Sequence, residues 1–207
     1  IDCSIACTAT TCGKSTFRRV FLCEMPYGGS VRFGSKDLSR FSPRELSGMV
    51  GYLGHDPELS MDTIQNNVLF GSRQDVLPQL NAVVLTDEVR AMENGADTVV
   101  GSSGARLSGG QAQRLALART LAHPRPLMIL DDPFSALDRK TEDAVFANLQ
   151  AYAKDKVVFL ISHRLYHFPQ MQQVIFMEDG KTTVGTHDEL MASVPTYRWL
   201  YESQTGG

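Results

Sequence analysis

A loop with the residue types of a phosphate-binding site lies near the start of the sequence. Residues 8–16 read Thr-Ala-Thr-Thr-Cys-Gly-Lys-Ser-Thr and match the pattern G-x-x-x-x-G-K-[ST], except that Thr8 replaces the first glycine. In such a loop Lys14 neutralises phosphate oxygens, Ser15 offers its hydroxyl to Mg²⁺, and backbone N–H groups at a helix start bind the anion. Because Gly-Lys-[Ser/Thr] also occurs by chance, an ordinary strand-to-helix turn is the alternative. The residues predicted to bind nucleotide are Thr8, Thr10, Thr11, Cys12, Gly13, Lys14, Ser15 and Thr16.

A second candidate anion site lies at residues 107–111, Leu-Ser-Gly-Gly-Gln. The helical run that follows places Ser108 and two glycine amides at a helix N-terminus, where the helix dipole favours a phosphate. A serine N-cap would explain Ser108, but not Gly-Gly-Gln followed by a helix that carries Arg114 and Arg119. The residues predicted to contact a phosphate here are Leu107, Ser108, Gly109, Gly110 and Gln111.

Two apolar runs that read as buried strands end in polar residues. Residues 127–130 are Leu-Met-Ile-Leu and lead into Asp131 and Asp132, and residues 157–161 lead into Ser-His163. Each feature has a structural explanation when taken alone, because two acids can simply end a strand and a histidine after a strand is usually structural. Because the two candidate anion sites occur in the same chain, we favour a functional interpretation of the Asp131-Asp132 pair and of His163.

These motifs resemble those of the nucleotide-binding domains of ATP-binding cassette (ABC) exporters. The resemblance covers nearly the whole chain, and the order of the motifs is more specific than any one of them. Their counterparts in the sequence are Walker A at 8–16, the Q-loop at 50–57, the X-loop at 98–104, the signature at 107–111, Walker B at 127–132, the D-loop at 135–138, the H-loop at 159–165 and the closing motif at 185–190.

The resemblance implies that the chain binds ATP and Mg²⁺ and hydrolyses ATP. In this family two cassettes sandwich two ATP molecules, each held between the Walker A motif of one chain and the signature of the other. The residue roles that follow are metal binding by Ser15, Asp131 and His55, catalysis by Asp132, His163 and His55, and ATP contact by Asp138.

Four positions in the chain's own ATP site depart from the family pattern, and Ser102 of the X-loop also stands where the family commonly has an acid. Thr8 and Thr11 stand where the family usually has glycine, and a left-handed backbone at either threonine would cost about 1–3 kcal/mol. Asp132 replaces the glutamate that orients the attacking water, and His55 replaces the Q-loop glutamine. A water misplaced by about 1 Å can slow a reaction roughly a hundredfold. We therefore predict slow hydrolysis at this site.

The order of predicted elements indicates an α/β fold of the P-loop NTPase (RecA-like) class with a mainly parallel sheet. Residues 57–122 have little strand character and are too many for a simple crossover. We predict that they form an inserted helical subdomain ending in the signature helix, and that residues 1–56 and 123–207 form the nucleotide-binding core. The N-terminal antiparallel β-subdomain of the family, with its adenine-stacking A-loop aromatic, is expected to be truncated, because the chain starts at Ile1 like an excised piece.

The apolar patterns place each motif at the end of an element. Strands are predicted at 2–7, 49–54, 126–131, 157–161 and 173–178, with a hairpin turn at Asp179-Gly180 into 181–185. Helices are predicted at 14–23, 61–69, 75–83, 109–122, 139–153, 187–193 and 196–202.

Composition and charge disfavour nucleic acid as the main partner, a membrane-spanning helix and a zinc site. A net charge of -3 and a pI near 6.0 disfavour a protein built mainly to hold nucleic acid. No apolar run approaches the roughly 20 residues of a membrane-spanning helix. Cys3, Cys7, Cys12 and Cys23 lack the paired C-x-x-C spacing of a zinc site, so we predict reduced thiols packed in the core.

The resemblance implies two partners: the transmembrane domains of an exporter, which would hold the chain at the cytoplasmic face of a membrane, and a second, non-identical nucleotide-binding domain. The intact signature beside an altered Walker site is what favours a non-identical partner. Two alternatives stay open: an ATP-gated clamp that does not hydrolyse ATP, and a soluble ABC ATPase of nucleic-acid metabolism. The sequence does not indicate a transported substrate.

Overall fold

The computed structural model describes residues 3–7, 14–56, 58–101 and 104–206. The chain divides into two compact units, which are described separately. Unit 1 contains Ile1–Gly51, Arg125–Ile129 and Lys156–Gly207, and unit 2 contains Tyr52–Pro124 and Leu130–Asp155. The boundaries predicted for the nucleotide-binding core and the helical subdomain stay a prediction.

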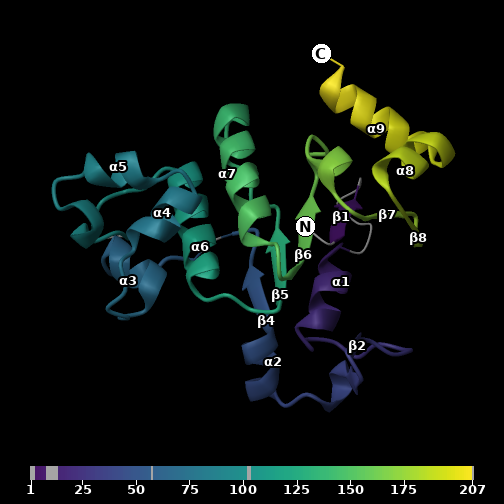
Figure 1. The fold of residues 1–207 in the computed structure, drawn as a ribbon, viewed down its shortest axis with the longest axis horizontal. Helices are drawn as coiled ribbons and strands as arrows, with labels where there is room; N and C mark the ends of the chain where they lie inside the picture. Colours follow the sequence, from purple (N-terminus) through teal and green to yellow (C-terminus); the bar gives the residue numbers. More distant parts are fainter. Residues whose placement is uncertain (1–2, 8–13, 57, 102–103, 207) are drawn as a thin grey trace. The chain divides into compact units, whose positions relative to one another are not determined.

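Figure 1 shows the strands and helices of the described chain. The strands are β1 Cys3–Cys7, β2 Arg32–Phe33, β3 Lys36–Asp37, β4 Val50–Leu53, β5 Leu127–Asp131, β6 Val157–Ser162, β7 Val174–Glu178 and β8 Lys181–Gly185. The helices are α1 Lys14–Phe21, α2 Pro43–Met49, α3 Ile64–Leu69, α4 Leu77–Ala82, α5 Thr86–Arg90, α6 Gly109–Ala122, α7 Arg139–Tyr152, α8 His187–Ser193 and α9 Pro195–Thr205. Short 3₁₀ turns lie at η1 Leu38–Arg40, η2 Gly95–Asp97 and η3 Phe168–Gln170.

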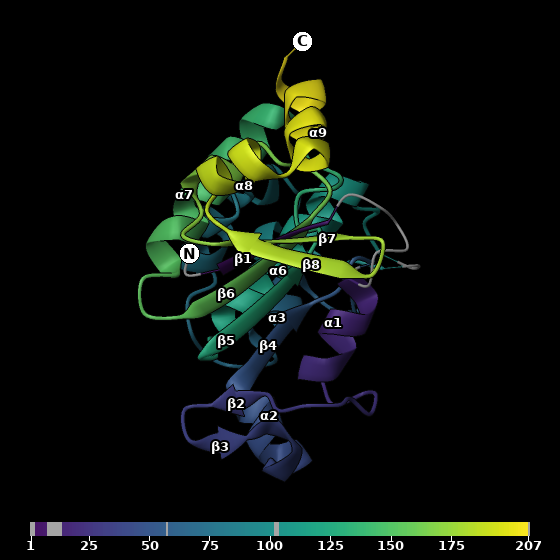
Figure 2. The same ribbon diagram turned by 90° about the vertical axis from the view of Figure 1, so that its right-hand side faces the viewer.

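The main sheet has six strands in the order β4-β5-β6-β1-β7-β8. Strand β1 pairs in parallel with β6 and β7, and β8 returns antiparallel along β7 (Figure 2). The turn between β7 and β8 has positive φ at Asp179 and Gly180, the backbone that a two-residue Asp-Gly hairpin requires. The predicted α/β fold with a mainly parallel sheet is confirmed.

Strands β5, β6 and β7 are buried along most of their length, so the loops that follow them start from rigid elements. Val158, Ile161 and Val174 have no exposed surface, and Phe176 is 1% exposed. Such continuous apolar strands are typical of parallel sheets covered on both faces by helices. On β7, Phe176 packs edge-on against Tyr197 of α9, with ring centroids 5.4 Å apart. Helix α9 is thereby fixed to the sheet.

Unit 2 is organised around α6, against which α3 and α4 pack (Figure 1). Four consecutive residues of α6, Leu115 to Ala118, are fully buried. A helix buried on all sides needs apolar or small side chains around its whole circumference, and the Leu-Ala-Leu-Ala run supplies them. The signature residues open this helix, so they start from a rigid element.

The structure departs from the predicted elements where polar sequences form short helices. Helices α2 and α5 were not predicted, although Ser42 and Glu45 form a capping box at the start of α2 and Pro43 is its first residue. Helix α1 ends at Phe21, two residues early, and Cys23 follows in a left-handed conformation. The expectation that the cysteines are packed in the core is wrong for Cys23, which is a free and exposed thiol, because it lies in this turn.

Within the described part of the chain, no helix has the length and apolar character to cross a bilayer.

Candidate functional site

The two carboxylates predicted from the sequence lie at the end of β5, where the chain turns sharply. Asp131 is the last residue of the strand, and Asp132 follows with a φ of 53° and 7% of its surface exposed. Aspartate adopts this left-handed region more readily than most residues. The carbonyl of Asp132 accepts hydrogen bonds from the backbone N–H of Ser135 at 3.2 Å and from Gln113 Nε2 at 3.4 Å. The backbone of Asp132 is therefore fixed by two hydrogen bonds, one from within the turn and one from α6.

The structure brings His55 and Asp132 together, two of the predicted catalytic residues. His55 follows β4, and its Nδ1 lies 3.7 Å from Asp132 Oδ2. This distance suits an ion pair but is too long for a hydrogen bond. The His55 side chain is 54% exposed and that of Asp132 10%. The imidazole is thus accessible to solvent while the carboxylate is largely shielded.

The signature residues form a capping box at the start of α6. The Ser108 hydroxyl accepts a hydrogen bond from the Gln111 backbone N–H at 3.2 Å, and Gln111 Oε1 accepts one from the Ser108 N–H at 2.9 Å. The first N–H groups of any helix lack partners within the helix and favour anions. Because Ser108 and Gly109 are exposed, a phosphate can reach this helix end.

Glu88 and Arg114 support the signature, and the sequence did not identify either as a site residue. Glu88 Oε2 accepts from Gln111 Nε2, and its Oε1 accepts from Arg114 Nη1, both at 2.7 Å. The buried Arg114 also donates to the Val84 carbonyl at 2.5 Å and to the Gly110 carbonyl at 3.2 Å. Burial acts to raise the pKa of Glu88, but hydrogen bonds from Arg114 and Gln111 bring that pKa below its ordinary value. The sequence analysis noted Arg114 on the signature helix, but its only signal for Glu88 was an acid in the polar segment that forms α5.

The second signature glycine contacts the D-loop closely. A Cβ placed on Gly110 would lie 2.9 Å from the Ala136 carbonyl oxygen, whereas one on Gly109 would have only an ordinary contact with Ala136 Cβ at 3.8 Å. Glycine is therefore required at position 110 by this packing. Two residues later, Asp138 caps α7 by accepting from the Thr141 hydroxyl at 2.7 Å and the Thr141 N–H at 3.0 Å. These bonds lower the pKa of Asp138.

The H-loop follows β6 and is held through its backbone. His163 is exposed, while Ser162 and Leu165 on either side are buried. The Ser162 hydroxyl accepts from the Arg164 N–H at 3.0 Å. From α9, the Gln204 side chain contacts both His163 and Leu165. The sequence did not point to Gln204, which lies 41 positions from His163.

Most of the Walker A prediction lies outside the described residues. This holds for Thr8, Thr10, Thr11, Cys12 and Gly13, and for the side chains of Lys14 and Ser15, which begin α1. Thr16, in the first turn of α1, is exposed. The nucleotide-binding roles of these residues stay predictions.

The residues at the end of β5 fit a magnesium ion that is held mainly by substrate. No cluster of three or more His, Cys, Asp or Glu side chains among the described residues could hold a metal by itself. In nucleotide sites, however, Mg²⁺ is bound by one or two protein oxygens together with phosphates and water, and it supplies positive charge to the phosphate oxygens. Asp131 offers such an oxygen. His55 offers a nitrogen, which suits Mg²⁺ less well.

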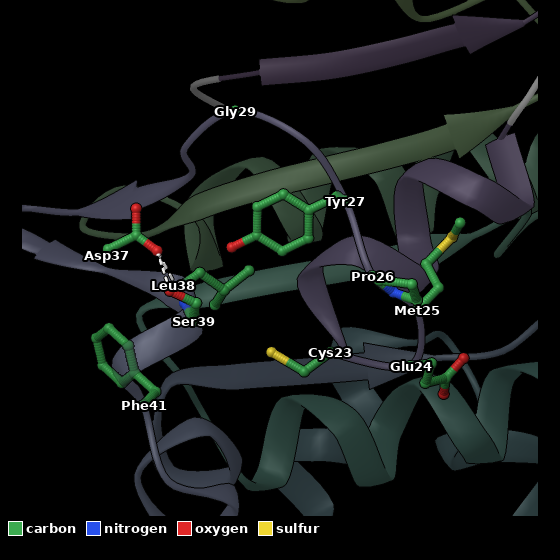
Figure 3. A pocket seen from close by; sticks show the side chains of 10 residues that line it. All are labelled: Cys23, Glu24, Met25, Pro26, Tyr27, Gly29, Asp37, Leu38, Ser39 and Phe41. Atoms are coloured by element: carbon green, nitrogen blue, oxygen red, sulfur yellow. Dashed lines mark hydrogen bonds between the residues drawn. The ribbon is translucent and has the colours of Figure 1, made fainter.

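A separate cavity of 590 Å³ lies in unit 1, between the end of α1 and the β2–β3 hairpin (Figure 3). It contains none of the predicted site residues. Asp37 accepts hydrogen bonds there from the Ser39 N–H and hydroxyl, and burial raises the pKa of Tyr27, with Asp37 and Cys23 adding to the rise. The cavity is lined by Cys23, Glu24, Met25, Pro26, Tyr27, Gly29, Asp37, Leu38, Ser39 and Phe41.

Comparisons with known proteins agree with the motif order. The family profile described as ABC transporter matches residues 9–135. The probable multidrug resistance ABC transporter ATP-binding/permease protein YheI of Bacillus subtilis is 33% identical over 94% of this chain and 34% of its own length. The ATP-dependent lipid A-core flippase of Burkholderia pseudomallei is 38% identical over 86% of this chain and 31% of its own length. The chain thus spans about a third of the curated relatives that it matches.

A solved structure, that of a bacterial Atm1-family ABC exporter with ATP bound, superimposes with a TM-score of 0.91 at 28% identity. The match covers 98% of this chain and 37% of the exporter. Sequence and fold agree, and the chain belongs to the ABC transporter family.

Proposed function

We propose that this chain is the ATP-binding and hydrolysing cassette of an exporter, and that it hydrolyses ATP slowly at its own Walker site. The observation that carries the proposal is the turn after β5, where Asp131 and Asp132 stand together and Asp132 lies 3.7 Å from His55. Asp131 would contact Mg²⁺ through water, and Asp132 would orient the attacking water. The shorter side chain of Asp132 places its oxygens further from that water than a glutamate would.

His55 would complete this site from the Q-loop. Its ring is exposed enough to contact water or nucleotide while it faces the carboxylate of Asp132. Since a nitrogen ligand suits Mg²⁺ poorly, we assign His55 a contact through water to the metal shell. His163 would contact the γ-phosphate, as its counterpart does in the family.

We further propose that the signature of this chain completes the ATP site of a second, non-identical cassette, and that transmembrane domains hold both at the cytoplasmic face of a membrane. Three features support this arrangement: the relatives are transporters, the signature retains the family residue types, and four changed residue types lie in the chain's own site. The soluble ATPase of nucleic-acid metabolism is the weaker candidate, since the relatives are named as a multidrug resistance ABC transporter and a lipid A-core flippase.

The experiment that tests the proposal is Asp132→Glu in the full-length natural protein. We expect the rate of ATP hydrolysis to rise by about 10- to 100-fold, because the longer side chain moves the carboxylate toward the water. Asp143→Glu is the matched control, since Asp143 is half-exposed on α7 and pairs with Arg139. An unchanged rate for Asp132→Glu, with ATP still bound, would favour the non-hydrolysing clamp.

A further inference from the structure

The backbone of the H-loop is bridged by one side chain from the last helix. Gln204 Oε1 accepts a hydrogen bond from the Leu165 N–H at 2.9 Å, and Gln204 Nε2 donates one to the His163 carbonyl at 2.8 Å. A single side-chain amide thus satisfies polar groups of residues 163 and 165, on either side of Arg164. This segment follows β6 without regular structure, so its backbone groups need partners from elsewhere.

Helix α9 is a firm support for this bridge. Tyr197 has no exposed surface; its ring packs on Phe176 of β7, and its hydroxyl lies 2.8 Å from His187 Nδ1. Arg198 donates to the Met191 carbonyl at 2.6 Å and to the Ala192 carbonyl at 3.1 Å, which ties α9 to the end of α8. Figure 2 shows α8 and α9 following directly on β8. Because α9 is fixed to the sheet and to α8, Gln204 holds the H-loop backbone in a defined place relative to both.

We infer that Gln204 is a positioning residue that sets the orientation of the switch histidine, His163, through the backbone. This inference rests on the proposed function, in which His163 contacts the γ-phosphate of ATP. Without the amide bridge the peptide after His163 can rotate, and the imidazole moves with it. A shift on the order of 1 Å is enough to lose a hydrogen bond of that kind. ADP lacks the γ-phosphate, so its binding does not depend on the bridge.

The test compares Gln204→Met with the unchanged full-length natural protein. Methionine keeps the length of the side chain but makes neither hydrogen bond. The measurement is the Kd of a non-hydrolysable ATP analogue and of ADP, each with Mg²⁺, by calorimetry. We expect the Kd of the ATP analogue to rise about 5- to 30-fold, the effect of losing one or two hydrogen bonds, while the Kd of ADP stays the same. In a His163→Ala background, Gln204→Met should change neither Kd.

Two further variants separate positioning from a structural role. Gln204→Glu retains the acceptor for Leu165 but loses the donor to His163, so it should also weaken only the ATP analogue, even if Gln204→Met does not fold. Thr205→Val removes a hydrogen bond within α9, from the Thr205 hydroxyl to the Tyr201 carbonyl at 2.8 Å, and should leave the ratio of the two Kd values unchanged.

The inference alone would be overturned if Gln204→Met weakened the binding of ADP and of the ATP analogue equally, or left the ratio of their Kd values unchanged. It would also be overturned if Gln204→Met still weakened the ATP analogue in the His163→Ala background. If the unchanged protein bound neither nucleotide, both the inference and the proposed function would be overturned.

Discussion

The signature region and the catalytic-acid region, both in unit 2, differ in how closely their side chains are bonded to one another. At the signature, Ser108, Gln111, Glu88 and Arg114 form one connected set of hydrogen bonds, each between 2.7 and 3.2 Å long. At the catalytic acid, His55 and Asp132 approach only to 3.7 Å, and both residue types differ from those usual in the family. In the family the signature serves the partner's ATP, whereas the catalytic acid serves the chain's own. The contrast agrees with our proposal that the signature of this chain completes the ATP site of a second cassette.

The largest effect on stability is expected from Arg114→Ala. Arg114 is the buried member of the hydrogen-bonded set Ser108, Gln111, Glu88 and Arg114, which we call the signature network. The change removes one of the two partners of Glu88, leaving Gln111, and it removes the side-chain donor to the Val84 and Gly110 carbonyls. We expect the free energy of unfolding to fall by about 3 kcal/mol, measured by urea denaturation. Arg90→Ala is the control, because its pair with Asp87 is exposed on both sides and 3.9 Å apart, and it should change stability by less than about 0.5 kcal/mol. Similar losses for both variants would mean that the network is no stronger than a surface pair.

Restoring the usual family residues in the catalytic-acid region should raise the rate of ATP hydrolysis. We expect His55→Gln alone to raise ATP hydrolysis by about 2- to 5-fold, and the double variant His55→Gln/Asp132→Glu by up to about 100-fold. Side chains this close interact, so the double effect should differ from the product of the single effects by about twofold or more. The measurement is kcat of the full-length natural protein in a double-mutant cycle. Strict multiplicativity would show that the two residues act independently.

The two signature glycines give a matched pair for the contact with the D-loop. Alanine favours a helix at either position, but at position 110 its Cβ would meet the Ala136 carbonyl at 2.9 Å. We expect Gly110→Ala to lower the free energy of unfolding by about 1–2 kcal/mol and Gly109→Ala to leave it equal or slightly higher. Urea denaturation of both variants measures the difference. Equal stability of the two would contradict the close contact.

The smallest effect concerns the pH dependence of the signature network. The pKa of Glu88 is lower in the folded protein than its ordinary value of 4.5, so the ionised carboxylate stabilises the fold above that pH. This contribution disappears as the pH falls through the lowered pKa. Glu88→Gln should therefore be less stable than the unchanged protein near neutral pH, and this difference should shrink at acidic pH. Urea midpoints across the acidic range measure it, with Glu202→Gln on the exposed face of α9 as the control. A constant difference at all pH values would speak against an ionic role.

Prediction from the sequence worked best where a local pattern and its tertiary setting agree. The helical run that follows Ser108 predicted α6 with the observed bounds, and the Asp-Gly pair predicted the turn between β7 and β8. It failed where short polar segments become helical through caps and packing, as in α2 and α5. It also failed at Cys23, because a shift of two residues in a helix end moves a side chain from the interior to the surface.

The sequence by itself determined the family and the motif order, and it predicted the residues that could touch phosphate, because all three depend on residue type at fixed spacing along the chain. Only the tertiary structure decided which distant residues support them. Glu88 and Arg114 behind the signature, His55 beside Asp132 and Gln204 beneath the H-loop are brought there by helix packing and sheet order. No local pattern encodes these contacts, since each joins residues that lie far apart along the chain.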